Sequence, residues 1–180
     1  MGTISWKTDR IANTTPEEFY DLIVRNRQHI YLTFPATSSS CTSLEKTKTF
    51  LKNAAALEQG GRGYYFYLRN SDNLMIGYIC IKNIDRNCDK CELAYFVDKD
   101  YQGQGIISKA VSNITAYCFN KINMNKVFIC AATTNIGSQR VAKKNGYLQE
   151  GLLREDFKNG DGKLEDTLYF GLLKSEYNER

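Results

Sequence analysis

A segment just past the middle of the chain, residues 97–108, constrains the fold more than any other feature. Residues 92–97 form a mostly apolar, strand-like run, Gly103 and Gly105 follow in a polar loop, and residues 107–119 have helical spacing of apolar side chains. A helix start has backbone N–H groups without helical partners, and the helix dipole favours an anion there. Glycine also lets the backbone approach a phosphate without an intervening Cβ atom. The segment is therefore a candidate diphosphate-binding loop.

Two familiar phosphate-binding patterns do not fit this loop. The P-loop pattern requires Lys and then Ser or Thr after its second glycine, whereas Ile106 and Ile107 follow Gly105 here. The dinucleotide pattern requires a third glycine at the position of Ser108 and an early place in a βαβ unit. The loop therefore belongs to neither class.

The segment resembles the acetyl-coenzyme A loop of the GNAT superfamily of amine acetyltransferases, whose pattern is V-x-x-x-x-Q/R-x-x-G-x-G/A. Val97, Gln102 and Gly105 match in register, and the last position is Ile107, a departure that the RimL-like branch of ribosomal-protein N-terminal acetyltransferases tolerates. The resemblance covers nearly the whole chain. Further matching segments are residues 91–95, 135–138, 145–151 and 166–174.

The resemblance implies acetyl-coenzyme A as co-substrate, no metal, and direct attack of an amine on the thioester. A backbone N–H near the end of the strand would polarise the thioester carbonyl, which requires the neighbouring strand to splay away. The residues expected to bind the coenzyme are Phe96, Val97, Gln102, Gly103, Gln104, Gly105, Ile106, Ile107, Ser108 and Asn135.

Proton transfer requires a base for the amine and an acid for the leaving thiolate. Glu92 is the first candidate base, and its alternative is a solvent-facing carboxylate or one paired with a lysine or arginine. Asp156, where the RimL-like branch has a glutamate, is the second candidate, and its shorter side chain favours an aspartate of a surface turn instead. Ser138 is the candidate acid because Ala142 replaces the tyrosine of many members. Ser138 and Asn135 are also ordinary helix-capping residues.

Composition limits the other functions. A net charge of +4 without a basic block does not indicate nucleic-acid binding, and residues 62–68 match an RNA-stacking motif only in part. Cys88 and Cys91 have the spacing of half a zinc site, but the remaining cysteines are solitary and His29 is the only histidine, so no metal is predicted. No apolar run suits a membrane span and no signal peptide is evident, so a cytoplasmic location is expected.

The pattern of predicted elements indicates one α+β domain over residues 1–180, with a mixed sheet flanked by helices. Helices are expected from Pro16, over residues 44–58, 107–119 and 138–145, and a polar loop over residues 36–43. Strands are expected over residues 64–68, 74–81, 92–97 and 126–132, and around a turn at residues 159–162. The acceptor stays open between a protein N-terminus, such as that of a ribosomal protein, a polyamine and an aminoglycoside. A non-catalytic coenzyme-binding protein is the alternative, and the sequence leaves open whether the chain forms a homodimer.

Overall fold

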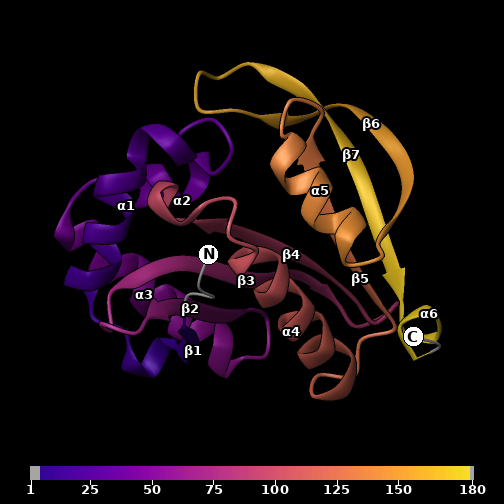
Figure 1. Ribbon diagram of the computed structural model, residues 1–180, viewed down its shortest axis with the longest axis horizontal. Helices are drawn as coiled ribbons and strands as arrows, with labels where there is room; N and C mark the ends of the chain where they lie inside the picture. Colours follow the sequence, from indigo (N-terminus) through magenta and orange to yellow (C-terminus); the bar gives the residue numbers. More distant parts are fainter. Residues whose placement is uncertain (1–4, 179–180) are drawn as a thin grey trace. The chain divides into compact units, whose positions relative to one another are not determined.

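The computed structural model describes residues 5–178, which fall into two compact units. The N-terminal unit comprises described residues 5–80 and 95–107, and the C-terminal unit comprises residues 81–94 and 108–178. The elements, labelled in Figure 1, are β1 (Trp6–Arg10), η1 (Ile11–Asn13), α1 (Pro16–Ile30), α2 (Pro35–Ser40), α3 (Leu44–Gln59), β2 (Tyr64–Asn70), β3 (Met75–Asp85), β4 (Lys90–Val97), η2 (Lys99–Tyr101), α4 (Ile106–Asn120), β5 (Lys126–Ala132), α5 (Ile136–Lys144), β6 (Leu148–Lys158), β7 (Leu164–Leu173) and α6 (Lys174–Asn178).

Within the described residues, hydrogen-bonded strands follow the order β1-β2-β3-β4-β5-β7-β6. β4 and β5 are parallel, whereas β1 with β2, β5 with β7 and β6 with β7 are antiparallel. A parallel pair requires a crossover connection, and α4 provides it between β4 and β5. The predicted α+β class with a mixed sheet is therefore confirmed.

Helix α1 begins where the sequence predicts. The Thr15 side chain accepts a hydrogen bond from the Glu18 backbone and the Glu18 side chain accepts one from the Thr15 backbone, which forms a capping box ahead of Pro16. The buried side of this helix carries Phe19, Leu22, Ile23, Asn26 and Ile30. Their spacing places one apolar face of α1 against the core of the N-terminal unit.

Arg69 of β2 joins the first elements of the N-terminal unit. Its side chain is buried and contacts Glu18 Oε1 at 2.7 Å, Asp9 Oδ2 at 3.2 Å and the carbonyl oxygen of Asn13 at 3.1 Å. These partners lie on α1, β1 and η1. One guanidinium therefore ties the edge strand and the start of α1 to β2.

The expectation of a loop over residues 36–43 is wrong, because α2 occupies Pro35–Ser40. Proline at the first helical position pre-sets the backbone, and the Ser38 N–H donates to the carbonyl oxygen of Phe34 at 3.0 Å. The side chains of Thr37 and Ser38 are buried. Tertiary burial therefore overrides the weak helix propensity of this Ser/Thr segment.

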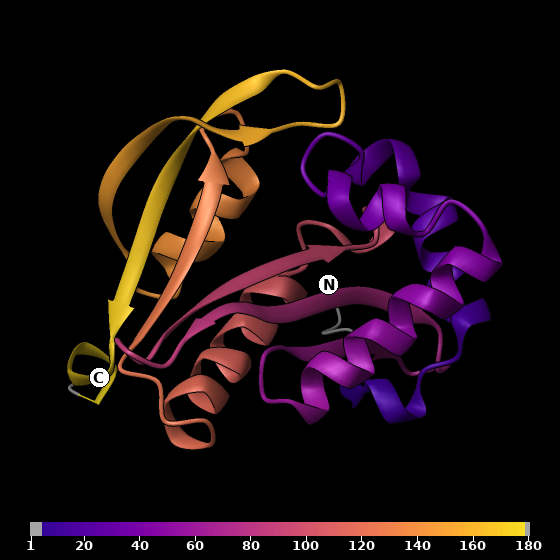
Figure 2. The same cartoon turned by 180° about the vertical axis from the view of Figure 1, so that it is seen from behind.

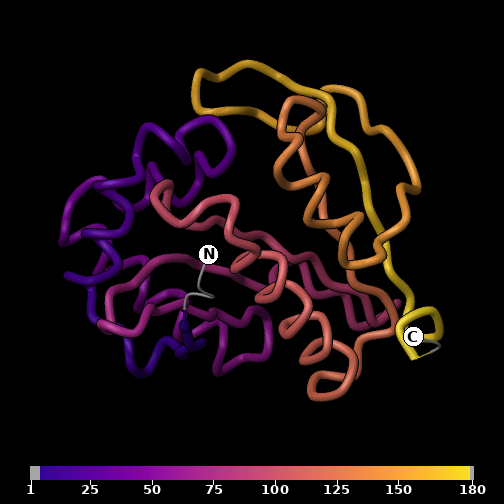
Figure 3. Tube along the Cα trace, in the orientation of Figure 1, coloured from indigo at the N-terminus to yellow at the C-terminus, as the bar shows by residue number. Residues whose placement is uncertain are grey.

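The C-terminal unit contains a long hairpin of β6 and β7, which α6 follows. Figure 2 shows β7 between β5 and β6, and Figure 3 shows the trace turning back after β6. Helix α5 lies along one face of this sheet. The predicted turn at residues 159–162 is confirmed: the Asn159 side chain accepts hydrogen bonds from the backbone N–H groups of Asp161 and Lys163, each at 3.0 Å.

Candidate active site

The glycine loop lies in the N-terminal unit between the end of β4 and the start of α4. Gly103 and Gly105 have φ angles of 71° and 76°, in the left-handed region where glycine avoids the strain of a side chain. A Cβ atom at either position would meet no other atom within 4 Å. Both glycines therefore border open space at the start of the 15-residue helix α4. This geometry fits a diphosphate, which needs close backbone approach at a helix N-terminus.

Asp98 anchors the first turn of this loop. Its side chain is buried, accepts a hydrogen bond from the Asp100 backbone at 3.1 Å, and pairs with Arg25 Nε of α1 at 2.6 Å. Burial raises the pKa of Asp98, but hydrogen bonds from Asn26 and Arg25 outweigh it, so the pKa lies below its usual 3.8. Asp98 is therefore an ionised anchor at neutral pH.

Phe96 and Val97 end β4 with their side chains in the core. The Phe96 ring is 6% exposed and packs at 5.3 Å from the Phe34 ring and 5.8 Å from the Tyr78 ring, measured between centroids. The Val97 side chain is 8% exposed. Any contact of these residues with a coenzyme is therefore expected through their backbone.

The other loop residues differ in exposure. Gln102 and Gln104 are exposed, Ile106 is buried, and Ile107 is partly buried at the first turn of α4. The Gln104 side chain donates to the carbonyl oxygen of Asp100 at 3.2 Å. The Gln102 side chain contacts His29 of α1. Both glutamines are thus held by hydrogen bonds rather than by packing.

Ser108, the next predicted coenzyme residue, belongs to the C-terminal unit. It is buried in α4, and the Asn145 side chain donates to its hydroxyl oxygen at 3.2 Å and to its carbonyl oxygen at 3.1 Å. Asn145 follows the end of α5. The Ser108 side chain therefore links α4 to the end of α5 within this unit.

Asn135 and Ser138 lie where β5 leads into α5. Asn135 is the N-cap of α5, and its side-chain oxygen accepts a hydrogen bond from the Ser138 backbone at 3.0 Å. The capping role that the sequence allowed for either residue thus belongs to Asn135, and Ser138 stands in the first turn of the helix. The Ser138 hydroxyl is not the cap.

Glu92, the first candidate base, is buried in the part of β4 that belongs to the C-terminal unit. Lys82 Nζ lies 3.0 Å from its Oε1, and Asn83 Nδ2 lies 2.6 Å from its Oε2. Both partners come from the end of β3. The carboxylate is therefore paired with a lysine, one of the arrangements that the sequence allowed.

Asp156, the second candidate base, is an exposed residue of β6, and its Oδ2 accepts a hydrogen bond from the Thr167 hydroxyl at 2.9 Å. Besides burial, the negative charges of Glu92 and Asp156 both raise the pKa of the Cys130 thiol in β5. Burial chiefly raises the pKa of Cys130, the charges of Glu92 and Asp156 raise it further, and it reaches about 12 despite the opposing charge of Lys82. The charges of the two candidate carboxylates therefore both affect this thiol.

Cys130, which the charges of both candidate bases reach, was not singled out by the sequence. It is one of six cysteines and carries no motif, so only its place on β5 distinguishes it. Cys88 and Cys91, the pair with the spacing of half a zinc site, differ in exposure: Cys88 is exposed and Cys91 is buried. Residues 5–178 contain no group of three or more His, Cys, Asp or Glu residues that could hold a metal ion.

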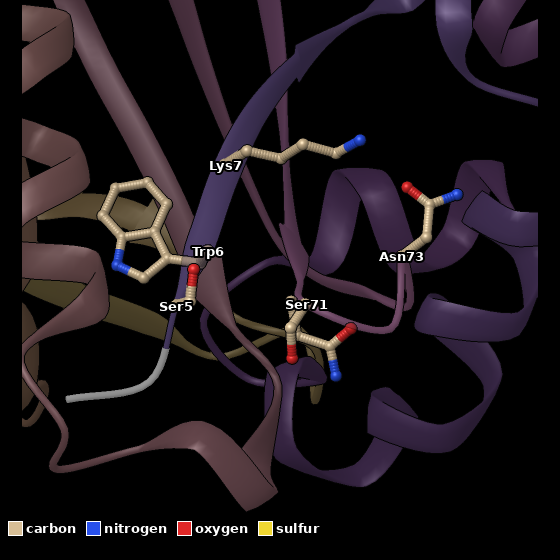
Figure 4. A pocket seen from close by; sticks show the side chains of 6 residues that line it. Ser5, Trp6, Lys7, Ser71 and Asn73 are labelled. Carbon is tan, nitrogen blue, oxygen red and sulfur yellow. The ribbon is translucent and has the colours of Figure 1, made fainter. Parts of the chain in front are cut away.

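A separate hollow of about 190 Å³ lies in the N-terminal unit. Figure 4 shows its polar lining beside β1 and the turn between β2 and β3. Its lining residues are Ser5, Trp6, Lys7, Asn70, Ser71 and Asn73. None of the predicted site residues lines this hollow.

The mixed sheet and the glycine loop at the start of α4 define an acyltransferase of the class that the loop motif predicts. Comparison with known families agrees: the pattern described as an acetyltransferase (GNAT) domain matches residues 11–148. The chain belongs to the GNAT acetyltransferase family and its RimL-like branch, and it is an N-acetyltransferase that acts on amines.

Two curated relatives carry names that refer to the ribosome. The chain is 30% identical over 165 residues to YdaF of Bacillus subtilis (strain 168), provisionally named a ribosomal N-acetyltransferase, with 89% of this chain and 87% of YdaF covered. It is 27% identical over 168 residues to the ribosomal-protein-serine acetyltransferase of Escherichia coli (strain K12), with 92% of each chain covered.

Solved structures share the fold. The ribosomal-protein-S5-alanine acetyltransferase from Vibrio fischeri matches with a TM-score of 0.86 at 21% identity, over 98% of this chain and 96% of that chain. RimL, a ribosomal L7/L12 alpha-N-protein acetyltransferase in complex with coenzyme A, matches with a TM-score of 0.83 at 19% identity, over 98% and 97% of the two chains.

No helix within residues 5–178 is long and apolar enough to cross a membrane.

Proposed function

We propose that this N-acetyltransferase uses acetyl-coenzyme A and transfers the acetyl group to the primary amine of a protein N-terminus by direct attack. The observation that carries the proposal is the pair of left-handed glycines, Gly103 and Gly105, open on one side at the start of α4. A diphosphate needs such a backbone surface, and coenzyme A carries a diphosphate.

The residues proposed to bind the coenzyme lie in the glycine loop and at the starts of α4 and α5. Backbone N–H groups of residues 103–108, with the Gln102 amide, would hold the diphosphate, and the Asn135 segment would contact the coenzyme at the start of α5. The backbone at Phe96 and Val97 would donate to the carbonyl oxygen. When bound, acetyl-coenzyme A supplies a thioester whose carbon–sulfur bond breaks as the acceptor nitrogen bonds to the acetyl carbon.

Proton transfers complete the proposed reaction. Glu92 takes the proton from the acceptor amine, and Asp156 is the second candidate for this step. Lys82 and Asn83 hold the Glu92 carboxylate in one orientation through contacts to separate oxygens. The Ser138 hydroxyl relays a proton from a water molecule to the leaving thiolate, and the Glu92 carboxyl group returns the amine's proton to solvent, so that no net proton is gained or lost.

The acceptor class rests on the relatives. The names of YdaF and of the Escherichia coli enzyme refer to ribosomal proteins, which favours a protein N-terminus. A polyamine is the second candidate because the spermidine N(1)-acetyltransferase of Vibrio cholerae is 23% identical over 115 residues, covering 64% of this chain and 66% of that enzyme. The cytoplasm, where such acceptors occur, stays the expected location.

The test is a panel of acceptors, each assayed by the amount of free thiol released from acetyl-coenzyme A. The panel contains a peptide with a free N-terminal Ser or Ala, the same peptide already acetylated at its N-terminus, spermidine and an aminoglycoside. Thiol release with the free peptide and none with the blocked peptide is expected. Release with spermidine and not with the peptide would favour the polyamine alternative, and release with none of them would contradict both acceptor classes.

A further inference from the structure

The C-terminal half of α1 contacts the segment between β4 and α4, which contains the glycine loop, at three points within the N-terminal unit. Arg25 Nε lies 2.6 Å from Asp98 Oδ2, and the Asn26 side-chain oxygen accepts a hydrogen bond from the Lys99 backbone at 2.9 Å. One turn further along the helix, His29 Nε2 lies 2.9 Å from Gln102 Nε2. Residues four apart lie on one side of a helix, so α1 presents a row of three contacts to the loop.

The three contacts have different environments. Asn26 and Asp98 are buried, at 0% and 1% exposure, so the first two contacts hold the root of the loop inside the fold. The contact between His29 and Gln102 is exposed and lies next to Gly103. It is therefore the contact nearest to the open side of the glycine loop, and its loss would leave the two buried contacts in place.

The chemistry of the contact fixes the role of each partner. The side-chain amide nitrogen of Gln102 faces His29 Nε2, and because an amide nitrogen only donates hydrogen bonds, His29 Nε2 is the acceptor of this contact. The Gln102 amide has two N–H groups, and only one is used on His29. The second remains a donor on a side chain whose orientation is set, and a preorganised donor binds an anion better than a mobile one.

We infer that His29 is a positioning residue for the coenzyme: its imidazole holds the Gln102 amide so that the remaining N–H faces the diphosphate. The inference rests on the proposed function, because it needs the loop to be the coenzyme site. It assigns a role to the only histidine of the chain, for which the sequence suggested none. Since the contact of His29 is with the Gln102 side chain, its loss is expected to weaken binding of the coenzyme and to leave the chemical step unchanged.

The test compares variants at position 29 by calorimetry with coenzyme A and by steady-state kinetics. His29→Phe keeps a planar ring but has no acceptor, so the Kd for coenzyme A and the KM for acetyl-coenzyme A are expected to rise about 3- to 10-fold, as for one hydrogen bond. His29→Gln offers an acceptor oxygen and is expected to restore much of the affinity. The kcat and the KM for the acceptor should not change in either variant.

Two controls separate this contact from general damage. Gln28→Ala alters the neighbouring exposed residue of α1 and is expected to bind coenzyme A like the wild type. In a Gln102→Ala background, His29→Phe should have no further effect, because the partner is already absent. An additive loss in the double variant would overturn the inference, and so would equal Kd values for wild type and a folded His29→Phe.

Failure of the inference is distinguishable from failure of the proposed function. Gly105→Glu places a negative side chain in the glycine loop and tests the loop itself. If it leaves the affinity for coenzyme A unchanged, the coenzyme site is elsewhere and both proposals fail. If it abolishes binding while His29→Phe binds normally, the loop assignment stands and only the role of His29 is wrong.

Discussion

Lys82 Nζ lies 3.0 Å from Glu92 Oε1, so the carboxylate proposed as general base is held in an ion pair at the end of β3. Asn83 occupies the other carboxylate oxygen at 2.6 Å. These two contacts fix the orientation of the Glu92 carboxylate.

Glu92→Gln is expected to lower kcat by about 10²-fold or more, because it removes the group that takes the proton. The acidic limb of the pH–rate profile should flatten in the same variant. Glu155→Gln is the matched control, since it makes the same change at an exposed position of β6. If the acidic limb survives in Glu92→Gln and disappears in Asp156→Asn, Asp156 is the base instead.

Substitutions at Gly105 should separate side-chain bulk from charge. Gly105→Asn adds a side chain that tolerates the left-handed backbone, whereas Gly105→Glu also adds a charge that repels the diphosphate. Calorimetry with coenzyme A should show a loss of about 100-fold or more for Gly105→Glu and a smaller loss for Gly105→Asn. Gly151→Glu, at a glycine with equally open space on β6, should bind normally. Equal affinity in all three folded variants would contradict the loop assignment.

Substitutions of Asn135 and Ser138 should affect different quantities: the first lowers the free energy of unfolding, and the second lowers kcat. Asn135→Ala deletes the N-cap of α5 and is expected to cost about 1 kcal/mol of unfolding free energy. Ser138→Ala keeps the backbone N–H that Asn135 binds, so its melting temperature should change little. Its kcat should fall by about 10- to 100-fold if the hydroxyl protonates the thiolate. A fully active Ser138→Ala enzyme would remove Ser138 from the mechanism.

The ion pair between Glu18 and Arg69 predicts acid-sensitive stability. Hydrogen bonds from Arg69 chiefly lower the pKa of Glu18, burial opposes them, and the pKa falls from its usual 4.5 to about 2. A lowered pKa stabilises the fold fully above pH 4.5, and this contribution is lost as the pH falls from there toward 2. Glu18→Gln should therefore cost about 1 kcal/mol at pH 7, since solvent screens this partly exposed pair. Urea unfolding at pH 7 and pH 3 should show that the difference from wild type shrinks in acid.

The cysteines should differ in reactivity toward alkylation. Burial and the charges of Glu92 and Asp156 raise the pKa of Cys130 to about 12, so its thiol stays protonated at pH 8 and reacts slowly. Cys88 is exposed in the turn between β3 and β4. Limited iodoacetamide treatment followed by peptide mass analysis should find Cys88 modified well before Cys130. Preferential labelling of Cys130 would contradict this account of its environment.

Local sequence was sufficient for the elements whose signals are local. Gly103 and Gly105 indicated a loop that side chains would strain, and both have positive φ. The helix start at Thr15 and Pro16 and the strand at residues 126–132 also follow from caps and side-chain type. The family itself could be inferred because its motifs are short and ordered along the chain. The roles of individual site residues were left open by the same patterns, which equally suit caps, turns and ion pairs.

Tertiary structure decided what depends on distant partners. β1 has the polar sequence Trp6–Arg10 and becomes a strand because it pairs with β2, some sixty residues later, where Arg69 holds Asp9. The polar α2 forms because Thr37 and Ser38 are buried. Cys130 meets the charges of Glu92 and Asp156 because β4, β5 and the β6–β7 hairpin assemble in the C-terminal unit, and His29 meets Gln102 because α1 packs along the loop in the N-terminal unit. A one-dimensional pattern carries backbone preferences and periodicity, whereas burial, ion pairing and charge depend on contacts between residues far apart in the chain.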